Sequence, residues 1–209
     1  MKKNILLAGV GGQGILSIAA VMDLAAIESG LQIKQAEVHG MSQRGGAVQS
    51  HLRISDATIY SDLIPEREAH LILSVEPMEA LRYLPWLAED GVIVSSIDPV
   101  RNIPDYPDME KIAEAIRKAA PHILVNAEAL ALQAGSSRMA NMIVLGAASP
   151  WTGLEPGALE KAVRTLFGPK GCEIVDMNIA AFRTGRGLSE KGSGLKAAAT
   201  AKTTERQRV

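Results

Sequence analysis

The residues best suited to bind a ligand form a glycine-rich turn, Gly9-Val10-Gly11-Gly12-Gln13-Gly14, directly after an apolar run. Its glycines at 9, 11 and 14 have the GxGxxG spacing of phosphate-binding turns. A helix expected from about residue 12 to 29 would direct free N–H groups and its positive dipole end at the turn, which favours a bound anion. The sequence therefore predicts that Gly9, Gly11, Gly12, Gln13 and Gly14 contact a phosphate group. The alternative is a close strand-to-helix crossing that binds nothing.

A second polar cluster follows later in the chain, where Glu37, His39, Gln43 and Arg44 precede Gly45-Gly46. The planar guanidinium of Arg44 can bond a carboxylate or phosphate through two parallel N–H groups, and the two glycines permit close backbone approach. Two interpretations stay open. The segment binds an anionic ligand, or it is an interface loop in which Arg44 pairs with a carboxylate of this chain or of a partner.

Glu37 also has a place in a dinucleotide-binding hypothesis. It follows Gly14 by 23 residues, close to the offset at which such a unit places its ribose-binding acid. The loop after Glu37 is more polar and richer in glycine than that of a simple nucleotide-binding unit, and no arrangement for hydride transfer accompanies it. The alternative is an ordinary solvated carboxylate at the end of a strand.

Composition argues against several classes of function. The single cysteine, Cys172, can form no internal disulfide and cannot by itself hold an iron–sulfur cluster or a cysteine-rich zinc site. The four histidines show no metal-ligand spacing, so we expect no metal site and assign no catalytic residue. A net charge of -1 and an aromatic content of 3% indicate no nucleic-acid partner. No apolar run approaches the roughly 20 residues of a membrane helix, so the expected compartment is the cytoplasm.

Strand and helix patterns alternate along most of the chain. Apolar runs predict strands near residues 5–10, 31–38, 47–54, 70–75, 91–97 and 122–126, with a further short strand at Thr58 to Ser61. Helical spacing predicts helices near residues 12–29, 76–84, 108–120, 127–134, 137–148, 155–167 and 172–187. This order is typical of an α/β protein with a doubly wound, mostly parallel, Rossmann-like sheet and helices on both faces. We expect one domain over residues 1–187 and a disordered polar tail over residues 188–209.

The two glycine motifs together resemble a known family. The segments Gly9 to Ile15 and Glu37 to Gly46, followed by the run from Val48 to Ile54, are similar to the gamma-type domain of the 2-oxoacid:ferredoxin oxidoreductases. The resemblance extends from Met1 to about Gly187. The sequence from His39 to Gln43 is most similar to that of the small beta subunit of the indolepyruvate ferredoxin oxidoreductases. It implies an enzyme that oxidatively decarboxylates an arylpyruvate to an acyl-CoA and passes electrons to ferredoxin. Related gamma domains serve pyruvate, 2-oxoglutarate and branched-chain oxoacids.

The resemblance also implies how the chemistry is divided between subunits. Thiamine diphosphate and the iron–sulfur clusters would lie on a larger catalytic partner, and this chain alone would hold neither. Coenzyme A would be a candidate ligand of the glycine turn, and Arg44 would lie at the boundary with the partner. Two other hypotheses remain at this point: an independent Rossmann-type nucleotide-binding protein that uses Glu37 as a ribose ligand, and a non-catalytic assembly module.

Overall fold

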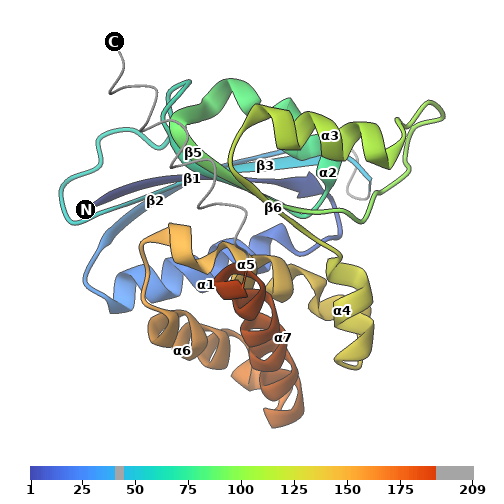
Figure 1. Ribbon diagram of the computed structural model, residues 1–209. Helices are drawn as coiled ribbons and strands as arrows, with labels where there is room; N and C mark the ends of the chain where they lie inside the picture. Colours follow the sequence, from blue (N-terminus) through green and yellow to red (C-terminus); the bar gives the residue numbers. More distant parts are fainter. Residues whose placement is uncertain (41–44, 192–209) are drawn as a thin grey trace.

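The protein is built around one six-stranded sheet with the strand order β2-β3-β1-β4-β5-β6 (Figure 1). The computed structural model describes residues 1–40 and 45–191. Strands β1, β4, β5 and β6 are parallel neighbours, whereas β3 is antiparallel to both β1 and β2. The predicted α/β class with a mostly parallel sheet is therefore confirmed. The strands are β1 (Lys2–Val10), β2 (Gln32–His39), β3 (Ala47–Ser55), β4 (Ala69–Ser74), β5 (Leu87–Ser96) and β6 (His122–Val125).

Strands β2 and β3 make one side of the sheet antiparallel. β3 pairs along its whole length with β1 and also pairs with β2, so β2 lies at the edge and does not touch β1. In a simple nucleotide-binding unit, the strand that follows the first helix lies directly beside the first strand. Here β3 takes that place.

Residues 56–66 form a loop, so the prediction of a strand at Thr58 to Ser61 is wrong. Arg53 on β3 donates hydrogen bonds to the carbonyl oxygens of Ser61 (2.8 Å) and Leu63 (3.0 Å). These two carbonyl oxygens are thus satisfied by an arginine side chain and not by a neighbouring strand.

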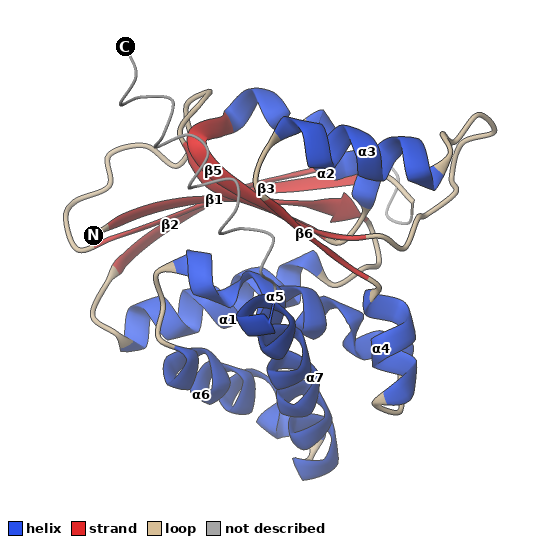
Figure 2. Cartoon of the chain, viewed as in Figure 1, coloured by secondary structure: helices blue, strands red, loops and turns tan. Residues whose placement is uncertain are grey.

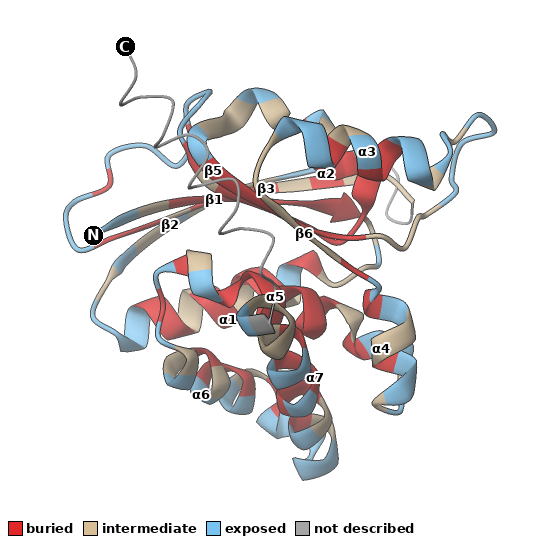
Figure 3. Cartoon of the chain, viewed as in Figure 1, coloured by how far each residue is buried: buried red, intermediate tan, exposed pale blue. Residues whose placement is uncertain are grey.

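Helices cover both faces of the sheet, as predicted (Figure 2). Among the described residues, five helices lie on one face, and α2 and α3 lie on the other. The buried apolar residues accordingly form two clusters, a large one against the five helices and a smaller one against α2 and α3 (Figure 3). Neighbouring residues Leu6 and Leu7 of β1 belong to different clusters, as the alternation of side chains along a strand requires. The five are α1 (Ile15–Glu28), α4 (Ala127–Gln133), α5 (Ala140–Thr152), α6 (Pro156–Phe167) and α7 (Cys172–Lys191), opposite α2 (Pro77–Arg82) and α3 (Met109–Ala119); three 3₁₀ turns cover Leu84–Trp86, Ser137–Met139 and Gly168–Lys170.

Helices α5 and α7 cross in close contact through two glycines. A Cβ atom on Gly146 of α5 would lie 1.9 Å from the carbonyl oxygen of Phe182. A Cβ atom on Gly185 of α7 would likewise lie 1.9 Å from the carbonyl oxygen of Ile143. Glycine is therefore required at both positions, although it is a poor helix former.

The last described helix, α7, runs to Lys191 and so continues past Gly187, where the sequence predicts the end of the folded part. Residues 192–209 of the predicted tail lie outside the described residues. None of the described helices combines the length and the apolar character needed to cross a membrane.

Candidate functional site

The glycine turn lies at the carboxyl end of β1. At this point of the sheet, the helices that follow two neighbouring parallel strands lie on opposite faces. The helix after β1 packs on one face, whereas the helix after the neighbouring parallel strand, β4, packs on the other (Figure 1). Such a switch point opens a crevice at which α/β proteins bind ligands. Gly12 and Gly14 have φ angles of 102° and 79°, in the left-handed region that favours glycine. The path of the turn therefore depends on glycine at both positions.

The first turn of α1 is open to a ligand. No side chain caps this end of the helix, so its N–H groups remain suited to an anion. Asn141 of α5 bonds the turn from the other side, because its Nδ2 donates to the carbonyl oxygen of Gly14 over 3.2 Å. A Cβ atom on Gly14 would lie 2.5 Å from that same Nδ2. The approach of α5 thus also requires glycine at position 14.

The structure brings the two glycine motifs together. The N–H of Gly11 donates to the carbonyl oxygen of Gly46 over 2.9 Å, and the N–H of Gly45 donates to the carbonyl oxygen of Gly11 over 3.4 Å. Asn102, in the loop after β5, donates from Nδ2 to the carbonyl oxygen of Gly45 over 2.5 Å. Residues that are far apart in the sequence therefore meet at the carboxyl end of β1, as expected if both motifs serve one site.

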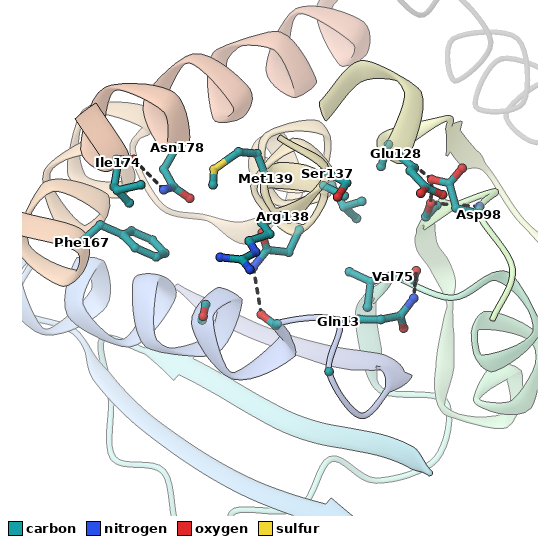
Figure 4. Close-up of a pocket in the computed structure, with 18 of the residues that line it drawn as sticks. Gln13, Val75, Asp98, Glu128, Ser137, Arg138, Met139, Phe167, Ile174 and Asn178 are labelled. Carbon is teal, nitrogen blue, oxygen red and sulfur yellow. Dashed lines mark hydrogen bonds between the residues drawn. The ribbon is translucent and has the colours of Figure 1, made fainter. Parts of the chain in front are cut away.

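A cavity of about 480 Å³ adjoins the turn on the side of the five helices (Figure 4). Gly12, Gln13 and Gly14 form part of its wall. The apolar part of the wall comes from the residue after β4, the 3₁₀ turn before α5, and the helices α5, α6 and α7. This volume lies in the range that small-molecule and cofactor sites occupy. The apolar lining includes Val75, Met139, Val144, Phe167 and Ile174.

Two cationic side chains line the cavity and have no carboxylate partner. Arg138 comes from the 3₁₀ turn before α5, and Lys170 from the connection between α6 and α7. Neither forms a salt bridge within residues 1–40 and 45–191. The ammonium of Lys170 lies 5.3 Å from the centre of the Phe167 ring, a cation–π arrangement. With the open end of α1, these two charges favour an anion in the cavity. The sequence analysis did not identify either residue.

Carboxylates lie in another part of the same cavity, away from Phe167 and Ile174 (Figure 4). The Oδ2 atom of Asp98 accepts hydrogen bonds from the hydroxyl of Ser96 (2.6 Å) and from the N–H of Glu128 (2.8 Å). These bonds hold the Asp98 carboxylate at the start of α4. The cavity therefore combines cations suited to phosphate with acceptors suited to ligand hydroxyl or amide groups.

Strand β3 separates Glu37 and His39 from this cavity. Glu37 pairs in register with Ser50 of β3, which pairs in turn with Leu7 of β1. Two strand spacings, roughly 10 Å, thus lie between Glu37 and the strand that carries the glycine turn. The imidazole of His39 contacts the Glu37 carboxylate, and neither residue lines the cavity. The strand order therefore does not support Glu37 as the ribose ligand of a dinucleotide site.

Gln43 and Arg44 lie outside the described residues. Their contact with an anion or a partner stays a prediction.

Asp23 on α1 faces the charge of Glu37 and is expected to titrate near neutrality. Burial and, secondarily, the Glu37 charge raise the pKa of Asp23 to about 6, and its Oδ1 atom is buried without a hydrogen-bond partner. Because the folded-state pKa is raised above the ordinary value of 3.8, the protonated form stabilises the fold at low pH, and this stability is lost as the pH rises from about 3.8 to about 6. Asp23→Asn should therefore stabilise the chain at pH 8 by about 1 to 2 kcal/mol, a value reduced for partial exposure, and by roughly half as much at pH 5.

Urea unfolding of the isolated chain at the two pH values checks this prediction. Asp105→Asn, in an exposed loop, is the matched control and should change stability at neither pH. Equal effects of Asp23→Asn at pH 5 and pH 8 would show that Asp23 is an ordinary surface carboxylate.

Two histidines, the buried His51 and the half-buried His70, have structural roles. Nδ1 of His51 accepts the N–H of Ile64 over 3.0 Å, and Nδ1 of His70 accepts the N–H of Asn4 over 3.0 Å. Burial lowers the pKa of both imidazoles, which are therefore neutral near pH 7. Within the described part of the chain, no three His, Cys, Asp or Glu side chains are grouped to hold a metal ion, and Cys172 is an exposed free thiol.

The family of this α/β chain follows from its similarity to known proteins. The chain belongs to the pyruvate ferredoxin/flavodoxin oxidoreductase family, whose sequence profile matches residues 4–188. Within that family it is 35% identical to indolepyruvate oxidoreductase subunit IorB of Methanothermobacter thermautotrophicus, over 90% of this chain and 98% of the relative. It is 30% identical to 2-oxoglutarate synthase subunit KorC of Methanothermobacter marburgensis, over 92% of this chain and 99% of the relative.

Solved structures share the fold. The gamma subunit of a keto/oxoacid ferredoxin oxidoreductase from Geobacter sulfurreducens superposes with a TM-score of 0.68 at 26% identity, covering 91% of this chain and 99% of that one. Pyruvate oxidoreductase subunit PORC of Thermotoga maritima gives a TM-score of 0.67 at 24% identity, covering 88% and 94% of the two chains. The family resemblance inferred from the two glycine motifs is confirmed.

Proposed function

We propose that this chain is the small subunit of a cytoplasmic arylpyruvate oxidoreductase, with indolepyruvate as substrate and ferredoxin as electron acceptor of the complex. The observation that carries the proposal is the pairing of the two glycine motifs beside a cavity with unpaired cations. The 35% identity to indolepyruvate oxidoreductase subunits supports the substrate class. The reaction converts an arylpyruvate, coenzyme A and oxidised ferredoxin into an aryl-acetyl-CoA, carbon dioxide and reduced ferredoxin.

Coenzyme A is our candidate for the ligand of the cavity, where it would supply the thiol that accepts the acyl group. Its phosphates need N–H donors and cations, which the open end of α1, Arg138 and Lys170 offer. Its adenine ring needs an apolar wall, which Phe167 and Ile174 offer. The residues present therefore fit the group. The 2-oxoglutarate:ferredoxin oxidoreductase of Magnetococcus marinus, whose fold is similar at 21% identity (TM-score 0.75, 92% of this chain and 32% of that one), was solved with coenzyme A bound.

Thiamine diphosphate and the iron–sulfur clusters are assigned to a larger partner subunit. An iron–sulfur cluster needs several thiolate ligands, and this chain has one cysteine. The proposed role of this chain is to bind the acyl acceptor and present it to the partner's active site. Arg44 is proposed to lie at the boundary, paired with a partner carboxylate or with an anionic group of coenzyme A or the oxoacid.

A substrate panel tests the proposal. The chain is co-purified with its thiamine-bearing partner under anaerobic conditions, and reduction of a dye is followed with indolepyruvate, phenylpyruvate, pyruvate and 2-oxoglutarate. We expect kcat/KM for the two arylpyruvates to exceed that for the aliphatic oxoacids at least tenfold, and turnover to require coenzyme A. A preference for pyruvate or 2-oxoglutarate would contradict the proposal that the substrate is an arylpyruvate. Turnover without coenzyme A would contradict the proposal that coenzyme A accepts the acyl group.

A further inference from the structure

The side-chain amide of Gln13 is bonded to backbone at both ends. Its Oε1 atom accepts the N–H of Val10 over 2.8 Å, and its Nε2 atom donates to the carbonyl oxygen of Val75 over 3.0 Å. Val10 ends β1, and Val75 directly follows β4. The amide therefore spans the gap between these two parallel strands at the switch point of the sheet.

Gly9 makes room for this crossing. A Cβ atom on Gly9 would lie 2.5 Å from Cγ2 of Val75 and 3.0 Å from Oε1 of Gln13. The backbone closes the same gap, because the N–H of Val75 donates to the carbonyl oxygen of Ala8 over 3.0 Å. Protein groups therefore fill the gap between the ends of β1 and β4.

The open side of the turn faces the helices instead. Figure 4 shows the Gln13 side chain beside Val75, with Arg138 in another part of the cavity wall. We infer that Gln13 is a positioning residue that bridges the ends of β1 and β4 and fixes Gly12 and Gly14, so that a phosphate binds at the cavity beside the turn. Gln13 then acts on the ligand through the backbone, whereas the sequence analysis assigned it direct ligand contact.

This inference rests on the proposed binding of coenzyme A. It predicts different effects for two substitutions of Gln13. Gln13→Met keeps the length of the side chain and removes both hydrogen bonds. Gln13→Glu keeps the acceptor for Val10 but loses the donor to Val75 and adds a negative charge beside the phosphate site. Gln35→Met is the matched control, because the side chain of Gln35 on β2 also forms two hydrogen bonds, which its Nε2 donates to Glu37 (3.1 Å) and Ser50 (2.9 Å), away from the cavity.

The experiment is a calorimetric titration of the assembled complex with coenzyme A in the absence of oxoacid, together with hydrogen exchange at the Val10 amide and steady-state kinetics. We expect Gln13→Met to raise the Kd for coenzyme A at least tenfold and Gln13→Glu to raise it further. Exchange at Val10 should accelerate in Gln13→Met, whereas KM for the arylpyruvate should stay within twofold. Gln35→Met should change none of these values. If Gln13→Met does not assemble, Gln13→Glu carries the test.

The possible failures are distinguishable. A wild-type complex that binds no coenzyme A overturns the proposed function and this role with it. Wild-type binding with an unchanged Kd in both Gln13 variants overturns the role of Gln13 alone. A parallel loss of kcat, oxoacid affinity and coenzyme A affinity in both variants also overturns it, because that pattern indicates a general structural defect.

Discussion

Gly146→Ala is expected to cost about 3 kcal/mol or more of folding stability, since the added methyl group has no space between α5 and α7. The new Cβ atom would lie 1.9 Å from the carbonyl oxygen of Phe182, which is backbone and cannot rotate away. The two helices would have to separate, and Phe182, a large and fully buried side chain, would lose packing. For a chain of this size the loss corresponds to a fall in Tm of about 6 to 12 °C, measured by thermal unfolding.

Gly157→Ala is the control for this substitution. Gly157 lies in α6, where a Cβ atom would meet no heavy atom within 4 Å. Alanine there should be neutral or stabilising by up to about 1 kcal/mol, because it favours the helix. Similar Tm values for the Gly146→Ala variant and the wild type would show that α5 and α7 do not cross as closely as described.

Charge reversal of both cavity cations, Arg138→Glu with Lys170→Glu, is expected to weaken coenzyme A binding at least 100-fold, which is about 2.7 kcal/mol. Both side chains lack a carboxylate partner among the described residues, so their charges remain available to phosphate. Reversal replaces attraction by repulsion at the open end of α1. Calorimetric titration of the assembled complex measures the change.

Arg117→Glu with Lys118→Glu on α3 makes the same change in net charge on the opposite face of the sheet. This control should alter the Kd for coenzyme A less than twofold. An equal loss of affinity in both double variants would indicate a general effect of net charge and not a local anion site.

The glycine turn was predictable because its requirements are local. Gly12 and Gly14 need left-handed backbone angles, and the strand and helix on either side follow from the spacing of apolar residues. The contact between the turn and Gly45-Gly46 was not predicted, since no property of residues in sequence order joins them. The sheet class was also predictable, because strands and helices alternate.

The cavity itself was not predictable. Arg138 and Lys170 lie more than a hundred residues after the turn. Each lies beside a predicted helix, and nothing in the sequence around either residue indicates a shared site. Their approach to α1 depends on how α5, α6 and α7 pack on the sheet. The position of β3 between β1 and β2 was also hidden, because an antiparallel strand and a parallel strand have similar patterns when both are half-buried. Because β3 lies between β1 and β2, Glu37 does not lie where the ribose-binding acid of a dinucleotide-binding unit lies.

Reconstitution from separated subunits tests the central claim most directly. The chain and its thiamine- and iron–sulfur-bearing partner are purified apart, mixed anaerobically, and assayed for ferredoxin reduction with indolepyruvate and coenzyme A. We predict that the chain alone has no activity, that the partner alone forms little or no acyl-CoA, and that mixing restores both acyl-CoA formation and ferredoxin reduction. Full coenzyme A-dependent activity of the partner without this chain, or no stable complex between the two, would contradict the account.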